Sequence, residues 1–221
     1  MMSRKWEKYK QHFTNADCQM HTTYTDGKST PEEYFEQAEK NGLDFILFSE
    51  HVRRTTTYDY LKFKEHVYRA GAKSTIKFAV GAEAKVLNEE GDIDISNELA
   101  REAEMILFSF HTPDFKTVAS YQKAVKNAAL NPLSDVFAHP TCYHNWQNME
   151  VTADEWLVML ESVKAANVCY EFNKKYELPG EAEIEALKKI SGIQFIYGSD
   201  AHQASSLLTH TDILNFRKLL E

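Results

Sequence analysis

The sequence contains little cysteine, glycine and proline, and it has no long apolar run. Its three cysteines, Cys18, Cys142 and Cys169, are odd in number and far apart, so neither a disulfide framework nor a thiolate zinc site is indicated, and we expect reduced, partly buried thiols. No segment approaches the roughly eighteen apolar residues of a membrane-spanning helix. Residues 1–7 lack the apolar stretch and the small-residue cleavage site of a signal peptide. These absences favour a cytoplasmic protein without a membrane partner.

The chain also has no excess of basic residues, since 25 Lys and Arg stand against 33 Asp and Glu, for a formal net charge of −8. A general nucleic-acid-binding surface needs a basic face, so this balance argues against nucleic acid as a partner without excluding it. A phosphorylated substrate would need metal ions or a local cationic cluster to bind. At 221 residues, 43% of them hydrophobic, the chain is long enough for one domain with a sizeable core.

Short apolar runs alternate with amphipathic segments, which predicts an α/β fold of parallel strands joined by helical crossovers. Strands are predicted at residues 17–21, 43–48, 76–82, 105–110, 135–138, 168–172 and 193–197. Helices are predicted at residues 31–41, 58–72, 96–102, 118–129, 152–165, 181–190 and 212–220. No glycine-rich phosphate-binding motif follows the first strand, which disfavours a nucleotide-binding sheet and leaves a barrel as the simplest arrangement.

The whole chain is expected to form a single domain. Its parts are an N-terminal helix, a barrel and a C-terminal helix, at residues 4–13, 15–205 and 210–221 of the 1–221 chain. Trp6, Tyr9 and Phe13 have the spacing of a short amphipathic helix that packs on the barrel. Thr152 followed by Glu155 is the pattern of a capping box, which predicts the start of one crossover helix.

Acidic and imidazole side chains stand at the carboxyl end of nearly every predicted strand. They are Asp17, His21, Glu50, His51, Glu83, His111, His139, Glu171, Asp200 and His202. Because the strands of a barrel end at one mouth, we expect these groups to converge there, and so many charges would be poorly tolerated without cations. Mixed His and carboxylate ligation suits Zn, Mn or Fe and does not choose among them. The pattern predicts a metal centre.

The other four histidines occupy weaker positions. His12 and His66 lie in predicted helices and His210 lies near the end of the chain, so packing or surface roles are expected for them. His144 lies in the predicted mouth loop 140–149, where contact with a substrate is an alternative to a structural role.

Seven short motifs follow one another along the chain. They are Asp17-x-Gln19-x-His21 continuing to Asp26-Gly27, Ser49-Glu50-His51, Gly81-Ala82-Glu83, Ser109-Phe110-His111, Ala138-His139-Pro140, Glu171-Phe172-Asn173 and Gly198-Ser199-Asp200-Ala201-His202. In this order and spacing, the chain resembles the PHP (polymerase and histidinol phosphatase) family over residues 15–205. The resemblance implies a distorted (β/α)7 TIM-like barrel with two or three divalent metal ions that hydrolyses phosphoesters.

The resemblance also implies a role for each matching residue. Three groups of ligands follow from it: His21, Glu83 and Asp200 for a first metal ion; Glu83, His111 and His139 for a second; and His51, His202 and the neighbouring Asp26 for a third. Asp17 and Glu50 match groups that orient imidazoles, and together with Arg53 they are the catalytic candidates.

Gln19 departs from the family pattern, which usually has a histidine at this position. A glutamine carbonyl oxygen is a neutral and weaker ligand than imidazole for borderline metals, so the first site is expected to be weakened or altered in preference. Three outcomes are open: an enzyme that uses the other metals, an enzyme that prefers harder ions such as Mn or Mg, or a non-catalytic metal-binding module.

The implied chemistry is hydrolysis of a phosphate ester by a metal-activated water, with a small phosphorylated metabolite as substrate, as in histidinol phosphatase. Cations that follow strand ends are candidates for phosphate contacts: Arg53 as first choice, then Arg54, Lys85, Lys174 and Lys175. One alternative is a phosphodiesterase or nuclease of the same family. Another is an amidohydrolase-like enzyme that cleaves C–N bonds, although the chain lacks the intact His-x-His that such an enzyme has after its first strand.

Overall fold

The computed structural model describes residues 4–111, 113–140 and 142–221. It contains a seven-stranded sheet in which each strand pairs in parallel with the next strand along the chain. The strands are β1 (Ala16–Met20), β2 (Phe45–Val52), β3 (Lys77–Lys85), β4 (Ile106–Ser109), β5 (Val136–Phe137), β6 (Cys169–Asn173) and β7 (Phe195–Gly198). All seven predicted strands are present.

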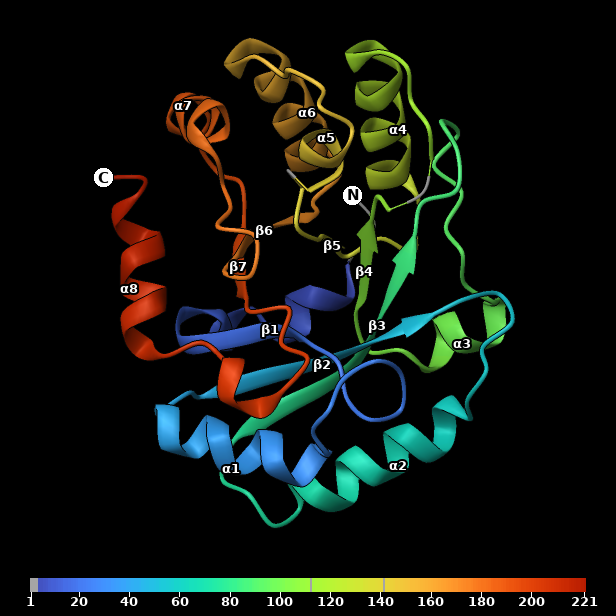
Figure 1. Cartoon of the computed structure of the whole chain (residues 1–221), viewed down its shortest axis with the longest axis vertical. Helices are drawn as coiled ribbons and strands as arrows, with labels where there is room; N and C mark the ends of the chain where they lie inside the picture. The colour runs from blue at the N-terminus through green and yellow to red at the C-terminus, as the bar shows by residue number, and fades with distance from the viewer. Residues whose placement is uncertain (1–3, 112, 141) are drawn as a thin grey trace.

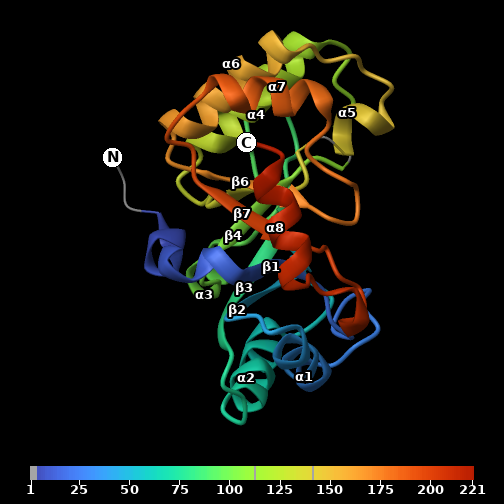
Figure 2. The same cartoon turned by 90° about the vertical axis from the view of Figure 1, so that its left-hand side faces the viewer.

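Helices lie outside the strands. The α-helices are α1 (Pro31–Asn41), α2 (Tyr60–Gly71), α3 (Asn97–Glu102), α4 (Val118–Leu130), α5 (Cys142–Trp146), α6 (Ala153–Ala165), α7 (Glu181–Lys189) and α8 (His210–Lys218). Figures 1 and 2 show α1 and α2 on one side of the strands and α4, α6 and α7 on the opposite side. Among the described residues, no helix is long and apolar enough to span a membrane.

The two end strands of the sheet meet and nearly close it into a barrel. Met20 forms a parallel bridge with Ala201, which follows β7, and the His21 N–H donates to the Ala201 carbonyl at 2.9 Å. The Tyr34 hydroxyl, from α1, lies 2.8 Å from the His21 carbonyl and 3.0 Å from the Ala201 carbonyl, which ties the helix to this junction. The predicted distorted (β/α)7 barrel is confirmed.

The alternation of the strands sorts their side chains between two cores. Ile46 and Phe48 of β2 pack in the outer core against the helices, whereas Phe45 and Leu47 belong to a smaller core inside the barrel. This inner core is completed by Trp6, Tyr9, Phe13, Ala16, Cys18, Ala79, Met105, Leu107, Val136, Ala138, Cys169 and Ile196. Because side chains alternate with a period of two, the inward positions that follow these apolar residues face the barrel mouth.

The N-terminal segment differs from the predicted single helix over 4–13. It forms two short 3₁₀-helices, η1 (Lys5–Lys8) and η2 (Lys10–Asn15). Trp6 and Tyr9 are three residues apart, which is one turn of a 3₁₀-helix, so this tighter helix directs both rings to one side. Trp6, Tyr9 and Phe13 are buried in the inner core, as the prediction that the segment packs on the barrel requires.

Local signals account for most element boundaries. Thr152 caps α6 through the predicted capping box with Glu155, and α1 ends at Gly42, whose φ of 68° is a left-handed conformation that glycine adopts without strain. Several boundaries differ from the prediction, and two of the differences lie at the barrel mouth. The second strand continues to Val52, and the loop predicted at 140–149 contains the short helix α5. The three cysteines are buried and unpaired, as expected.

Candidate metal centre

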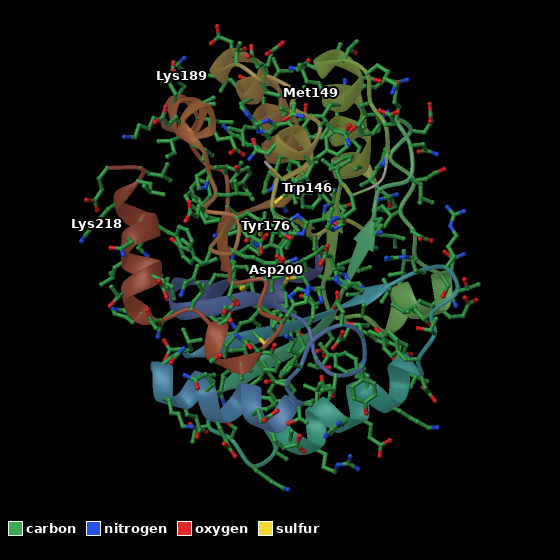
Figure 3. The ribbon with its side chains drawn as sticks, in the orientation of Figure 1. Trp146, Met149, Tyr176, Lys189, Asp200 and Lys218 are labelled. Carbon is green, nitrogen blue, oxygen red and sulfur yellow. The ribbon has the colours of Figure 1, made fainter. Side chains whose placement is uncertain are left out.

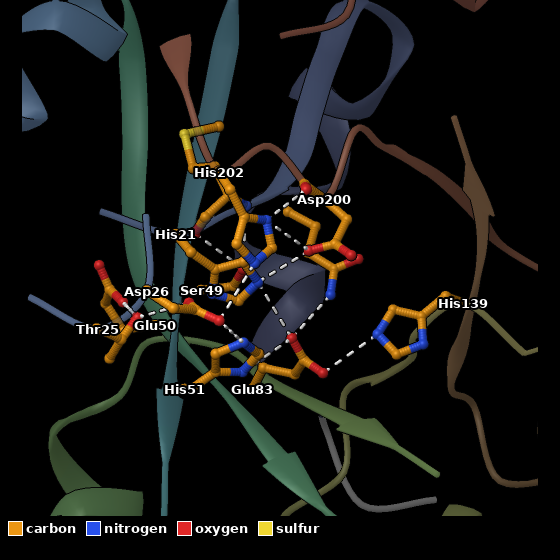
Figure 4. A network of polar contacts seen from close by, with 12 residues as sticks. His21, Thr25, Asp26, Ser49, Glu50, His51, Glu83, His139, Asp200 and His202 are labelled. Carbon is orange, nitrogen blue, oxygen red and sulfur yellow. Dashed lines mark hydrogen bonds and ion pairs between the residues drawn. The ribbon is translucent and has the colours of Figure 1, made fainter. Parts of the chain in front are cut away.

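The predicted ligands occupy inward positions at the carboxyl ends of the strands. Glu83 follows the inner-core residue Ala79 at even spacing along β3, and His51 follows Phe45 and Leu47 in the same way along β2. His111 lies two residues beyond the end of β4. Figure 4 shows His21, His51 and His202 on one side of Glu83 and His139 on the other.

The first group of ligands surrounds the buried imidazole of His21. Its Nε2 lies 3.0 Å from Asp200 Oδ1 and 3.3 Å from Glu83 Oε2. Oxygen and nitrogen atoms of these three residues lie close enough together to hold one cation. Asp200 has a φ of 48°, an uncommon left-handed value for a residue with a side chain, which is typical of functional sites.

The second group uses the other oxygen of Glu83. Oε1 lies 3.0 Å from His111 Nε2 and 3.2 Å from His139 Nε2. Glu83 is 1% exposed. Its Oε2 faces His21 and its Oε1 faces His111 and His139, so the two oxygens contact different imidazoles. A carboxylate in this position can bridge two cations.

The third group consists of three imidazoles. The rings of His21 and His51 stack with centroids 4.0 Å apart, and the ring of His202 lies 4.8 Å from that of His21. Asp26 Oδ2 lies 3.5 Å from His51 Nε2 and 3.4 Å from His202 Nε2, so the acidic residue stands beside this group as predicted. Asp26 is 57% exposed, which places it at the outer edge of the centre.

The donor set fits divalent metal ions. Within the described residues, His21 Nδ1 is buried without a hydrogen-bond partner, and His21 Nε2 faces Asp200 Oδ1 and Glu83 Oε2 as a close contact that lacks hydrogen-bond geometry. Buried polar atoms are nearly always paired, so unpaired imidazole nitrogens beside carboxylate oxygens indicate a place for an ion. Each of the three groups has its ligand atoms within 4.8 Å of one another. The residues of the three nominated ligand groups therefore meet in one place.

The carboxylates control the protonation of the imidazoles. Burial alone would lower the pKa of His21, but Asp200 and Glu83 outweigh it and raise the pKa to about 10. For His111, burial prevails and lowers the pKa, which favours the neutral imidazole that a metal needs. A proton held by His21 must leave when an ion binds there, so the affinity of that position for metal increases with pH.

Gln19 is buried in β1 and reaches the centre because of an irregularity in the strand. The pairing of β1 with β2 shifts register between Asp17 and Met20, and both Cys18 and Gln19 face inward around this shift. The Gln19 Nε2 donates to Glu83 Oε2 at 3.0 Å, and its Oε1 accepts from Asn173 at 3.0 Å. The amide therefore presents a donor to the centre, whereas the sequence-based prediction was a carbonyl ligand.

Asp17 and Glu50 do not orient imidazoles in the predicted way. Asp17 accepts hydrogen bonds from the N–H groups of Ser199 and Leu208, at 3.0 and 2.9 Å. Glu50 lies on the outer face of β2 and accepts from the N–H of Thr22 at 2.6 Å and from the hydroxyls of Thr22 and Thr25. Within the described residues neither carboxylate hydrogen-bonds an imidazole. Both hold the loops beside His21 and Asp200 and support the centre indirectly.

A hollow of about 350 Å³ lies above the ligands. Its walls are formed by Asp26, His51, Arg53, Glu83, Lys85, His111, His139, Trp146, Lys175, Tyr176, Asp200 and His202. Three of the five nominated cations, Arg53, Lys85 and Lys175, thus face the centre. Lys174 is paired with Asp212 at 2.9 Å and lies in an adjoining hollow instead.

Two aromatic residues of this hollow were not predicted. Trp146 of α5 stacks on His111 with ring centroids 5.4 Å apart, and Tyr176 contacts His139 at 5.5 Å and Trp146 at 5.9 Å. Figure 3 shows Trp146, Tyr176 and Asp200 near one another in the middle of the molecule. Their positions in loops that follow β5 and β6 were the available signal, but nothing in the sequence distinguished them from other loop aromatics.

The remaining histidines lie outside the walls of this hollow. His144 Nδ1 lies 3.0 Å from the Met149 carbonyl and its ring packs against Trp156, so the structural role predicted as one alternative applies. His66 pairs with Glu32 at 3.0 Å. His12 stacks on Phe45 at the other end of the barrel, and His210 begins α8.

Comparison with known proteins identifies related chains. The probable phosphatase of Vibrio campbellii is 27% identical over 201 residues, covering 85% of this chain and 77% of that protein. The probable phosphatase of Clostridium novyi is 25% identical over 131 residues, covering 55% of this chain and 51% of that protein. The chain therefore spans about half the length of several curated relatives that it matches.

Two solved structures share the fold. One is a two-domain protein from Bacteroides vulgatus that contains a predicted PHP-like metal-dependent phosphoesterase, with a TM-score of 0.52, 19% identity, and coverage of 86% of this chain and 52% of that one. The other comes from archaeal ribonuclease P with mature tRNA, with a TM-score of 0.56, 13% identity, and coverage of 92% and 82%. At these identities the likeness is one of fold.

The sequence pattern of the PHP domain matches residues 17–212, which is most of the chain and includes every residue of the three ligand groups. The barrel, the position of the ligands at its mouth and this match agree with one another, and the chain belongs to the PHP domain family.

Proposed function

We propose that the protein is a metal-dependent phosphatase that hydrolyses the phosphate ester of a small metabolite. The observation that carries this proposal is Glu83, whose two oxygens face two separate groups of buried ligands. Divalent ions held there, Zn, Mn or Fe, would activate water and polarise the phosphate. The chain's own residues hold the ions, exclude bulk water on the barrel side and surround the phosphate with positive charge.

The hollow supports a small substrate. Its volume of about 350 Å³ lies at the lower end of the range for sites that bind small molecules. Arg53, Lys85 and Lys175 stand around it in a chain whose net charge is −8, which meets the need for a local cationic cluster. Trp146 and Tyr176 offer an apolar wall for the organic part of the ester. These features favour a metabolite over a nucleic acid.

Metal analysis and hydrolysis assays test the proposal together. The purified protein, loaded with Mn, Zn or Fe, is expected to hydrolyse p-nitrophenyl phosphate faster than bis(p-nitrophenyl) phosphate, and a chelator should remove both the metal and the activity. Faster hydrolysis of the diester would assign a phosphodiesterase. If metal binds but neither ester is cleaved, the protein is a non-catalytic metal-binding module, the alternative that Gln19 raised.

Arg53 provides a specific test of the cationic wall. Its side chain is 39% exposed, lies 3.8 Å from Asp94, donates from Nη1 to the Val52 carbonyl at 2.8 Å and lines the hollow. A charge-assisted hydrogen bond to a phosphate contributes about 1.5–3 kcal/mol, so Arg53→Ala is expected to lower kcat/KM by roughly 10- to 100-fold without changing the metal content. Arg54→Ala is the matched control, because Arg54 is adjacent but does not line the hollow. Equal losses in the two variants would contradict the assignment.

A further inference from the structure

Two donor groups of the chain occupy the surroundings of the first cation position, between His21, Glu83 and Asp200. One is the side-chain amide of Gln19, and the other is the ammonium group of Lys175. Both donate to the very carboxylates that a metal ion would need there.

The orientation of the Gln19 amide is set by its neighbour Asn173. The Asn173 Nδ2 donates to Glu171 Oε2 at 3.2 Å, and its Oδ1 accepts from the Tyr176 N–H at 3.4 Å. The Tyr176 N–H can only donate, so it fixes the Asn173 oxygen on its side and leaves the amide nitrogen toward Glu171, whose Oε2 also accepts from the His139 N–H at 2.6 Å. Asn173 must therefore point its NH₂ group toward Glu171.

The orientation of the Gln19 amide follows from that of Asn173. The same Asn173 Nδ2 lies 3.0 Å from Gln19 Oε1, so Gln19 must place its oxygen there as the acceptor. Its NH₂ group is left to face Glu83 Oε2 at 3.0 Å. An amide NH₂ carries no lone pair for a metal, so Gln19 in this orientation supplies no ligand.

Lys175 brings a positive charge to the same place. Its Nζ donates to Asp200 Oδ2 at 2.7 Å and lies 3.4 Å from His202 Nδ1. Asp200 is 4% exposed, so this is a mostly buried carboxylate paired with a cation that enters from the hollow. A divalent ion bound to Asp200 would have to displace this ammonium group or lie beside it, and repulsion between the two charges opposes the second arrangement.

The ligand groups themselves also compete. The first group shares His21 with the third and Glu83 with the second, whereas the second and third groups share no residue. One imidazole nitrogen binds one ion, so His21 cannot serve the first and third positions through the same atom. Two ions can bind without sharing a ligand. One is then held by Glu83, His111 and His139, and the other by His21, His51 and His202.

We propose that this chain holds two metal ions, one in each of these separate groups, and that the ammonium group of Lys175 takes the place of an ion at Asp200. This inference rests on the metal centre of the proposed phosphatase and changes its composition. Lys175 then presents a fixed single positive charge to the hollow, where it can bind a phosphate oxygen as a point charge.

Metal counting tests this directly. The full chain is saturated with Mn²⁺ or Zn²⁺, desalted and analysed by mass spectrometry of the metal against protein concentration. We expect two ions per chain, and the double variant Gln19→His with Lys175→Met is expected to hold three. The matched control, Gln19→His with Lys174→Met, should stay at two, because Lys174 pairs with Asp212 away from the ligands. Three ions in the unmodified protein, or two in the first double variant, would overturn the proposal.

A single variant separates the two arrangements without creating a new site. Asp200→Asn is expected to leave the count at two, since Asp200 pairs with Lys175 instead of an ion. In a three-ion centre the same change would remove one ion. An unmodified protein that binds three ions and hydrolyses aryl phosphate would contradict only this inference, whereas one that binds none would contradict the proposed function as well.

Discussion

Replacing Glu83 by glutamine is expected to lower the phosphatase activity by more than about 100-fold and to remove one of the two bound metal ions. The side chain keeps its shape but loses its charge, and one of its two ends becomes an NH₂ group. Substitution of a residue that only supports a metal ligand already lowers metal affinity or activity about 10- to 100-fold. Glu83 is itself a ligand and belongs to two of the three groups. Hydrolysis of p-nitrophenyl phosphate and metal content per chain are the two measurements.

Glu89→Gln serves as the control for this variant. Glu89 undergoes the same chemical change, but it pairs with Lys123 on the surface, away from the hollow. Its activity and metal content are expected to match those of the unmodified protein. A Glu83→Gln variant with the full metal content and rate would show that Glu83 is not a metal ligand.

Replacing Arg4 by alanine is expected to lower the free energy of unfolding by about 3 kcal/mol or more. The guanidinium group, 8% exposed, donates to the carbonyls of Ala129, Asn131, Ser134 and Ala166 at distances of 2.7–3.1 Å. Three of these carbonyls lie at or just beyond the carboxyl ends of α4 and α6, where a cation is favourable. Alanine would leave several carbonyls without a donor, at about 1–3 kcal/mol each before relaxation.

Urea denaturation measures the loss of unfolding free energy, and two further variants serve as comparisons. Arg4→Lys keeps the charge but has a single ammonium group in place of the planar fork, so we expect it to recover only part of the loss. Arg69→Ala, in the exposed part of α2, should change stability by less than about 0.5 kcal/mol. Equal stability of the Arg4→Ala and Arg69→Ala proteins would refute the role of Arg4 as a clamp.

The prediction of the fold succeeded because the apolar runs and the local helix-start signals both indicated alternating strands and helices. Apolar runs such as 43–48 and 193–197 have the length and composition of buried parallel strands, and helix-start signals such as Thr152 with Glu155 are local. Where the outcome depended on distant contacts, the prediction was incomplete. The segment containing Trp6 and Tyr9 became two 3₁₀-helices because both rings enter the inner core of the barrel.

The sequence by itself determined which side chains meet at the barrel mouth. Strand ends are local features, and a parallel barrel brings all of them to one edge, so the ligands of the three groups could be named from their positions in the chain. The sequence did not determine the direction in which each of these side chains faces. Asp17 alternates with the inner-core residues Ala16 and Cys18 and therefore faces outward, and the outer face of β2 carries Glu50 toward Thr22, so neither hydrogen-bonds an imidazole among the described residues.

Only the tertiary structure decided how the ligands divide among ions. The orientation of Gln19 depends on Asn173, which lies 154 residues further along the chain, and on Glu171 of the same strand. Lys175 reaches Asp200 because the loop after β6 lies beside the end of β7. Hydrogen-bond direction is a property of the partners that folding brings together, so a residue type alone cannot reveal whether it will offer a lone pair or a proton to the metal centre.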